Sequence, residues 1–260
     1  MTAGPGSYFL RLRGILRSLR MYYGGRDARG RMDSFYGALV DRGDLCFDIG
    51  AHAGNRTLTF LRLGARVVAL EPQPDFQRLL RFLLLFRSAG EKSRVTLLAE
   101  AVGRESGTLE LHVSEATPTV TSGSRRFMDD TGAIPSFDIV DWNRRIEVPQ
   151  TTIDRLIERH GMPAFIKLDI EGMELDALFG LSRLPGLLSF EFLAGRTDDA
   201  LACLARIEDL GPVECQISRG EDLSFEWDGW RPADQVRSWL EDHRGEDFSG
   251  DIYARRLSPD

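Results

Sequence analysis

The chain has 260 residues, of which 42% are hydrophobic and 28% are charged, as in a globular protein with one sizeable core. No apolar run reaches the ~20 residues that cross a bilayer, and we recognise neither a secretory leader nor a zinc-type spacing of the three cysteines. We therefore expect a cytoplasmic protein with buried cysteines. The net charge of −7 argues against a general nucleic-acid binder.

The N-terminal residues 1–42 are expected to form a helical extension to the main domain, which we place at 43–260. Charge is uneven along the chain, because residues 1–31 carry a net +6 and the remainder carries −13. Apolar residues at helical spacing alternate with arginines over residues 8–23, which predicts a basic amphipathic helix. Such a helix can contact an anionic membrane, but packing on the main domain is the interpretation we favour. A second helix is predicted over 29–41.

Next comes a strand at 45–49, a glycine-rich turn, a helix at 54–63 and a strand at 66–71. This order is typical of a βαβ nucleotide-binding unit. The alternation then continues to the end of the chain, which predicts an α/β fold with a mostly parallel sheet and helices on both faces. The further elements are predicted as helices at 74–87, 173–180, 198–210 and 231–241 and strands at 95–99, 164–169, 187–192, 213–218 and 251–256.

The turn after the first strand indicates which nucleotide is bound. Gly50 and Gly54 allow a tight turn and a close approach of the backbone to a ligand. Asp48 would repel a pyrophosphate, but it suits a ligand that carries an ammonium and a sulfonium group. Glu71, at the tip of the second strand, can accept hydrogen bonds from a ribose diol. These residues favour S-adenosylmethionine over a dinucleotide.

An insertion near 107–148 interrupts the alternation of strands and helices. Apolar residues alternate over 109–113 like an edge strand, and those at 146–148 suggest its return partner. The segment 114–141 between them is rich in Gly, Pro, Ser and Thr. Loops of this length in compact domains are commonly lids or binding loops, so we predict a substrate-side lid.

A second strand-to-helix segment carries the block Lys167-x-Asp169-x-Glu171-Gly172-x-Glu174. With the other motifs in their order and spacing, this block resembles the FkbM family of S-adenosylmethionine-dependent methyltransferases. The remaining motifs are Asp48-Ile49-Gly50-Ala51, Glu71-Pro72, Ala101-Val102-Gly103 and Thr152-Ile153-Asp154. The resemblance implies a Rossmann-like class I methyltransferase fold with an antiparallel last strand. The family commonly has Asn at the position of His52.

The expected cofactor site gathers residues at or just beyond strand ends, where ligands of open α/β sheets bind. In it, amides of the Gly50–Gly54 turn and the following helix N-terminus receive the methionine carboxylate, and Asp48 stands near the amino group, directly or through water. Glu71 takes the ribose, and Glu100 and Ala101 flank the adenine. The residues expected to bind the cofactor are Asp48, Gly50, His52, Gly54, Glu71, Pro72, Glu100 and Ala101.

The expected catalytic residues are Asp169, Lys167 and Glu171. The resemblance places Asp169 beside the sulfonium and the acceptor, and Asp169, Glu171 and His52 are all candidates for the base that deprotonates an alcohol. Lys167 lies in a strand that should be buried, so its ammonium needs a partner. Asp169 and Glu191 are the candidates. Lys167 either positions Asp169 or the acceptor, or forms a structural ion pair. A divalent ion near Asp169, Glu171 and Glu191 is an open alternative, but we assign no metal ligand, since carboxylates alone are poor evidence for one.

The resemblance implies O-methylation of a small molecule, a sugar or a glycolipid. One alternative is a ribose 2′-O-methyltransferase of RNA, which would need a second lysine beside Lys167 and Asp169. An NAD-dependent oxidoreductase is disfavoured by Asp48. A catalytically silent adapter that keeps the cofactor fold is a third alternative, because fold alone does not prove activity. The oligomeric state is not indicated.

Overall fold

The computed structural model describes residues 27–114, 117, 120–132, 134–137 and 140–257. The basic helix expected at 8–23, with its proposed membrane contact, lies outside the described residues. The described part of the extension is helix α2 (Ala28–Gly37), whose buried Tyr36 ring packs edge-on against Phe60, with ring centroids 5.2 Å apart. Helix α2 therefore belongs to the core. Among the described helices, none has the length and hydropathy that would let it cross a membrane.

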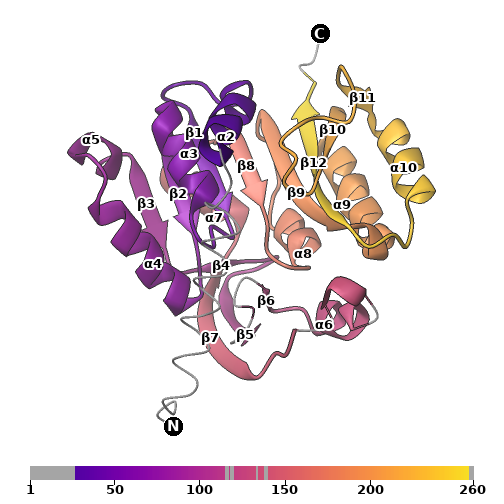
Figure 1. The fold of residues 1–260 in the computed structure, drawn as a ribbon, viewed down its shortest axis with the longest axis horizontal. Coiled ribbons are helices and arrows are strands. Elements are labelled where there is room, and N and C mark those ends of the chain that lie inside the picture. Colours follow the sequence, from indigo (N-terminus) through magenta and orange to yellow (C-terminus); the bar gives the residue numbers. More distant parts are fainter. Residues whose placement is uncertain (1–26, 115–116, 118–119, 133, 138–139, 258–260) are drawn as a thin grey trace.

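The main sheet has eight strands in the order β11-β10-β12-β9-β8-β1-β2-β3 (Figure 1). The strands from β9 to β3 are parallel neighbours, whereas β12 runs antiparallel between β9 and β10. The bounds are β1 Leu45–Ile49, β2 Arg66–Leu70, β3 Val95–Leu98, β8 Phe165–Leu168, β9 Leu187–Leu193, β10 Val213–Arg219, β11 Arg231–Pro232 and β12 Ser249–Arg256. This confirms the expected α/β fold with its antiparallel last strand.

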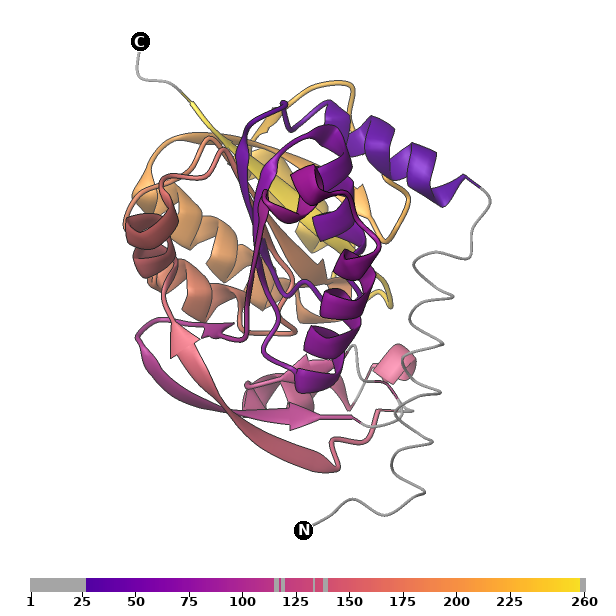
Figure 2. The ribbon, with the colours of Figure 1, turned by 90° about the vertical axis from the view of Figure 1, so that its left-hand side faces the viewer.

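Helices cover both faces of this sheet, as Figure 2 shows in the view along its edge. Helices α2, α3 and α4 enclose one apolar cluster, and α7, α8, α9 and α10 enclose the other. Their bounds are α3 Asn55–Leu63, α4 Pro74–Leu85, α5 Ala89–Lys92, α7 Ile153–His160, α8 Glu174–Phe179, α9 Thr197–Leu210 and α10 Ala233–Asp242, with the short 3-10 helix η2 at Ala194–Arg196.

Side chains alternate between the two clusters along the central strands. In β1, Phe47 and Ile49 face the cluster of α7 to α10, while Cys46 faces that of α2 to α4. Both faces of β1 are buried, which is why four of its five residues are apolar rather than every second one. The three cysteines are free and buried, as expected.

The insertion forms a second, smaller sheet rather than an extended loop. Its strands have the order β4-β7-β5-β6, and it lies below the main sheet in Figure 1. The bounds are β4 Ala101–Val102, β5 Gly107–Val113, β6 Thr121–Ser122, α6 Arg125–Thr131, the 3-10 helix η1 Pro135–Phe137 and β7 Arg144–Thr151. The predicted pairing is confirmed, since β5 and β7 are antiparallel with Leu111 opposite Ile146. The prediction of an edge strand is wrong, because β5 lies between β7 and β6.

Two helices in this region were not predicted. Helix α7 begins after Thr152, whose hydroxyl accepts a hydrogen bond from the Arg155 amide at 3.2 Å. Helix α6 begins after Ser124, whose hydroxyl accepts from the Phe127 amide at 3.1 Å. Both are short and use side-chain caps. In α7 the signal was present, because Ile153, Leu156 and Ile157 recur at helical spacing and face the core, whereas the 7 residues of α6 are too few for a clear period.

Candidate active site

A cavity of about 490 Å³ lies at the carboxyl ends of the parallel strands, between the main sheet and the insertion. Seven of the residues expected at the site line it, namely Gly50, His52, Glu71, Pro72, Glu100, Ala101 and Asp169. Further lining residues are Ile49, Leu70, Phe76, Val102, Leu109, Leu111, Thr121, Ile170 and Met173. The strand-end argument thus identified most of the polar wall.

The turn after β1 is built tightly against the strand end of β8. Gly50 has φ +85°, and a Cβ on it would lie 1.8 Å from the carbonyl oxygen of Asp169. Gly54 has φ +79°, and a Cβ there would lie 2.2 Å from Cδ2 of Leu80. Only glycine fits either position, since both the left-handed backbone and the close neighbours exclude a side chain. Gly54 lies against Leu80 of α4 and does not line the cavity.

The amides of this turn are already used within the protein. The Gly50 and Ala51 amides donate to the carbonyl of Leu70 at 3.0 and 2.9 Å, and the Gly54 amide donates to the carbonyl of Ala51 at 2.7 Å. This differs from the expectation that these amides receive the methionine carboxylate. They instead join the turn to β2 and fix the shape of the cavity wall.

Glu71 is held at the tip of β2 by two backbone amides. His52 donates to its Oε2 and Gln73 to its Oε1, each at 2.8 Å. The residue is 2% exposed, and burial raises the pKa of its carboxyl, against the lowering effect of His52 and the two amides. A carboxylate oxygen has a second lone pair. Glu71 can therefore still accept hydrogen bonds from a ligand in the cavity.

Asp48 does not reach the cavity. It is 2% exposed and accepts a hydrogen bond from the hydroxyl of Thr57 in the first turn of α3. Burial raises the pKa of its carboxyl, while Thr57 and Lys167 act in the opposite direction. Asp48 does not line the cavity, so any contact with a ligand's amino group through water stays a prediction. Its observed contact joins β1 to α3.

Glu100 and Ala101 lie at the opposite end of the cavity, next to the small sheet. The carboxylate of Glu100 accepts two hydrogen bonds from Arg159, at 3.1 and 3.0 Å. Leu109 and Leu111 of β5 line the same end. The sequence indicated the alternation of these leucines but not their place in the cavity. Ala101, Leu109 and Leu111 belong to one apolar cluster, and Glu100 adds a carboxylate to this part of the lining.

Lys167 lies in a buried carboxylate cluster beneath the cavity. It is 2% exposed, and its Nζ lies 2.7 Å from Asp251 in β12 and 3.3 Å from Asp169. Burial lowers the pKa of Lys167, but the two carboxylates outweigh burial and hold it well above the ordinary value. Asp251 was missed, although an acid within the apolar last strand is a signal that a buried lysine is nearby. Glu191, the other expected partner, bonds to Asp169 instead.

Asp169 is the only member of that cluster expected to meet a ligand, and it lines the cavity. Burial would raise the pKa of Asp169, but Lys167, His52 and the hydrogen bond with Glu191 hold it below the ordinary value. Asp169 is therefore ionised at neutral pH. Burial and the carboxylates of Asp169 and Glu171 raise the pKa of Glu191 well above the ordinary value.

The turn after β8 brings Glu171 beside Asp169. Glu171 has a left-handed backbone with φ +54°, and its carbonyl accepts a hydrogen bond from the Ser122 hydroxyl at 2.6 Å. Glu174 closes the turn by accepting from the amides of Ile170 and Gly172, at 2.9 and 3.0 Å. Burial and the carboxylates of Asp169 and Glu174 raise the pKa of Glu171 well above the ordinary value. Burial also raises the pKa of Glu174, to about 7.

Comparison with known proteins identifies this site. The family model described as the methyltransferase FkbM domain matches residues 48–245, which include every wall of the cavity. The chain belongs to the FkbM methyltransferase family. The predicted resemblance and its cofactor, S-adenosylmethionine, are thereby confirmed. No curated protein matches the sequence.

Solved structures show looser similarity to this FkbM methyltransferase. An O-methyltransferase from Bacillus cereus in complex with SAH has 12% identity and a TM-score of 0.47, covering 99% of this chain and 93% of that chain. A precorrin-6Y C5,15-methyltransferase from Geobacter metallireducens has 14% identity and a TM-score of 0.43, covering 90% of this chain and 92% of that chain. A TehB-like SAM-dependent methyltransferase from Corynebacterium glutamicum has 12% identity and a TM-score of 0.46, covering 97% of this chain and 98% of that chain. Such scores are too low to carry an argument about substrates.

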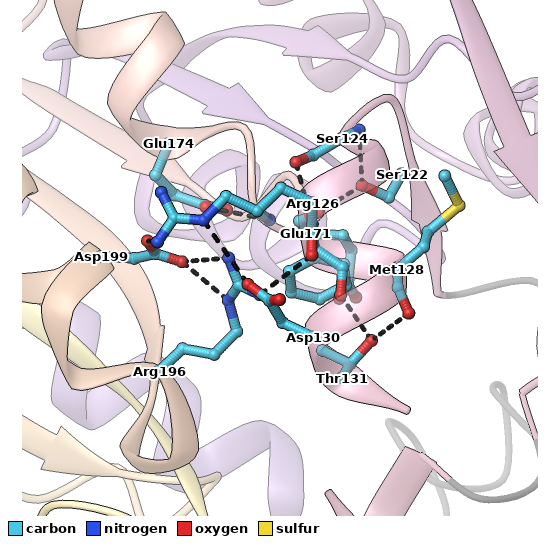
Figure 3. Close-up of polar contacts among 12 residues, drawn as sticks. Ser122, Ser124, Arg126, Met128, Asp130, Thr131, Glu171, Glu174, Arg196 and Asp199 are labelled. Carbon is cyan, nitrogen blue, oxygen red and sulfur yellow. Dashed lines mark hydrogen bonds and ion pairs between the residues drawn. The ribbon is translucent and has the colours of Figure 1, made fainter. Parts of the chain in front are cut away.

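In this FkbM methyltransferase the insertion is fastened to the main domain by ion pairs (Figure 3). Arg196, at the end of η2, contacts Asp130 of α6 at 2.8 Å and Asp199 of α9 at 2.7 Å. Its guanidinium also lies 5.3 Å from the ring centroid of Phe127. Arg126 reaches Asp199 at 3.3 Å. Arg196 is the stronger anchor, because its side chain is 8% exposed whereas that of Arg126 is 70% exposed.

Proposed function

We propose that this FkbM methyltransferase transfers the methyl group of S-adenosylmethionine to a hydroxyl oxygen of a small molecule, a sugar or a glycolipid. The observation that carries the proposal is that Glu71 and Asp169 line one cavity from opposite sides of the β1 turn. Glu71 provides a fixed acceptor for the ribose. Asp169 provides an ionised carboxylate where an acceptor hydroxyl would enter.

For the cofactor, we assign the apolar end of the cavity to the adenine and the Asp169 end to the sulfonium. Leu109, Leu111 and Ala101 offer apolar contacts for a flat ring, and Glu71 is placed to receive both ribose hydroxyls. The turn amides are occupied, so the methionine carboxylate needs another donor. Asn55, at the start of α3, is our candidate, since its Nδ2 has no acceptor in the described part of the chain.

The chemistry requires mainly alignment. The acceptor oxygen attacks the methyl carbon, the carbon–sulfur bond breaks, S-adenosylhomocysteine leaves, and the hydroxyl proton passes to a base. Alignment of the reacting atoms removes much of the barrier, and a positioned base contributes typically 10²- to 10⁴-fold. Asp169 is our first candidate for the base, because it is ionised and lines the cavity. Lys167 is a positioning residue, held between Asp169 and Asp251.

The insertion supports the role of a lid. Leu109, Leu111 and Thr121 of the small sheet line the cavity, and the ion pairs of Arg196 fasten α6 nearby. A cover that excludes water protects the sulfonium and strengthens the interactions of Asp169 with the acceptor.

The RNA alternative is not favoured. A lysine that assists ribose methylation must reach the cavity, whereas Lys167 is 2% exposed and paired with two carboxylates. The other lysine of the chain, Lys92, lies in α5, and no described lysine lines the cavity.

The test has two stages. Calorimetric titration with S-adenosylhomocysteine should show binding that Glu71→Ala weakens at least ~10-fold, with NADH as the negative control. A panel of glycosides and phenols is then screened for formation of S-adenosylhomocysteine. Asp169→Asn should lower kcat at least ~100-fold with unchanged affinity for S-adenosylhomocysteine. Full activity of Asp169→Asn would refute its role as base, and absence of cofactor binding by the folded protein would refute the proposal.

A further inference from the structure

Three side chains from two different turns converge beside the cavity. One ring nitrogen of His52 and one carboxylate oxygen each from Asp169 and Glu171 all lie within 4.8 Å of one another. Donor atoms bound at about 2.0–2.3 Å to one cation lie roughly 3–4.5 Å apart. Small side-chain rotations would therefore bring the three atoms around one ion.

His52 is the unusual member of this group. The residue is 8% exposed, and no hydrogen bond to its ring nitrogens occurs among the described residues. The ring packs against Phe76, with centroids 6.1 Å apart. Its backbone is fixed in the left-handed region, with φ +46°, by the hydrogen bond of its amide to Glu71. One ring nitrogen lies close to two carboxylate oxygens and has no hydrogen bond to another described residue, so it is available as a ligand.

Glu171 is held with similar rigidity. Its backbone is left-handed, and the hydroxyl of Ser122 fixes its carbonyl from the insertion. Its carboxylate has no hydrogen-bond donor in the described structure, and Lys167 lies against Asp169 rather than against Glu171. Such strained backbones persist where the surroundings over-determine them, which is common at functional sites.

We propose that His52, Asp169 and Glu171 bind a divalent first-row transition cation such as Mn²⁺. One imidazole nitrogen and two carboxylate oxygens form a mixed donor set of the type such ions accept. Two carboxylates balance the charge of the ion, and the remaining coordination positions would face the cavity, which His52 and Asp169 both line. Sequence reasoning considered a divalent ion near Asp169, Glu171 and Glu191 but did not include His52 as a ligand, because His52 follows β1 and the carboxylates follow β8.

The role of such an ion in catalysis rests on the proposed function, whereas its binding does not. In an O-methyltransferase the ion would hold the acceptor oxygen next to Asp169 and favour its deprotonated form. An acceptor with two neighbouring hydroxyls, as in a sugar or a catechol, would suit adjacent open positions on the ion. The proposal thus narrows the acceptor class to oxygen chelators.

The test is direct binding of Mn²⁺ to the full-length protein after removal of metals with EDTA. Electron paramagnetic resonance measures the loss of the signal of free Mn²⁺ during titration. We expect one saturable site, weakened about 10-fold or more in His52→Asn and in Glu171→Gln. Asparagine tolerates the left-handed backbone, so His52→Asn should retain the amide bond to Glu71. His160→Asn, remote from the cluster in α7, is the matched control and should bind like the wild type.

The outcomes separate the two proposals when the same samples are titrated with S-adenosylhomocysteine in EDTA. Cofactor binding without a Mn²⁺ site overturns the metal inference and leaves the methyltransferase proposal intact. A Mn²⁺ site that both cluster variants abolish, without cofactor binding, supports the metal inference and overturns the proposed function. Mn²⁺ binding that is unchanged in both folded variants places the ion elsewhere and refutes the inference.

Discussion

Substitution of Asp251 by Asn tests the buried ion pair beneath the cavity. Asp251 lies in β12 and accepts a hydrogen bond from Lys167 at 2.7 Å, while the two side chains are 8% and 2% exposed. Asn preserves the shape of the side chain but removes its charge. Lys167 would then retain only Asp169, at 3.3 Å.

The expected loss of stability follows from the burial of the pair. Removal of one partner of a buried ion pair typically costs about 3–5 kcal/mol, because the other charge remains without compensation. Since Asp169 still compensates Lys167 in part, we expect the lower end, about 3 kcal/mol. For a chain of this size, each kcal/mol lowers Tm by roughly 2–4 °C. Asp251→Asn should therefore lower Tm by about 6–12 °C.

Urea unfolding followed by circular dichroism measures this loss, with thermal unfolding as a second probe. Asp198→Asn removes a carboxylate that pairs with Arg244 at the surface, and it should change Tm little. A change below about 0.5 kcal/mol in Asp251→Asn, the size of an ordinary surface effect, would refute the reasoning.

Three further predictions concern the cavity walls and the insertion. Gly50→Ala should lower the affinity for S-adenosylhomocysteine at least ~10-fold in calorimetry, because the added Cβ would meet a backbone oxygen. Gly90→Ala is the control and should bind the ligand normally, because its Cβ would lie in open space. The folded-state pKa of Glu174 is about 7, above its ordinary value of 4.5, so the free energy of unfolding should fall by about 3 kcal/mol as pH rises between these values. Glu174→Gln should flatten this dependence of stability on pH, as measured by urea unfolding. An unchanged dependence would exclude Glu174 as its source. Arg196→Ala should speed proteolysis of the insertion more than Arg126→Ala does, and equal rates would contradict the exposure argument.

Much of the site was predictable because parallel strands end at one edge of a sheet. Gly50, Glu71 and Asp169 each follow an apolar run, and their order along the chain is enough to bring them together. The same reasoning did not reveal that Asp48 stays outside the cavity lining and bonds to Thr57 of α3. Local sequence shows that a carboxylate stands at a strand end, but it does not show which way the following turn directs it.

The sequence by itself determined the strand-helix alternation, the two glycine positions and the family block of Lys167 to Glu174, because these depend on local periodicity and backbone sterics. Only the tertiary structure decided the partner of Lys167, since Asp251 arrives on the antiparallel last strand. It also decided the approach of His52 to Asp169 and Glu171, which lie on separate turns. Contacts between distant segments depend on strand order and register, which no local pattern encodes.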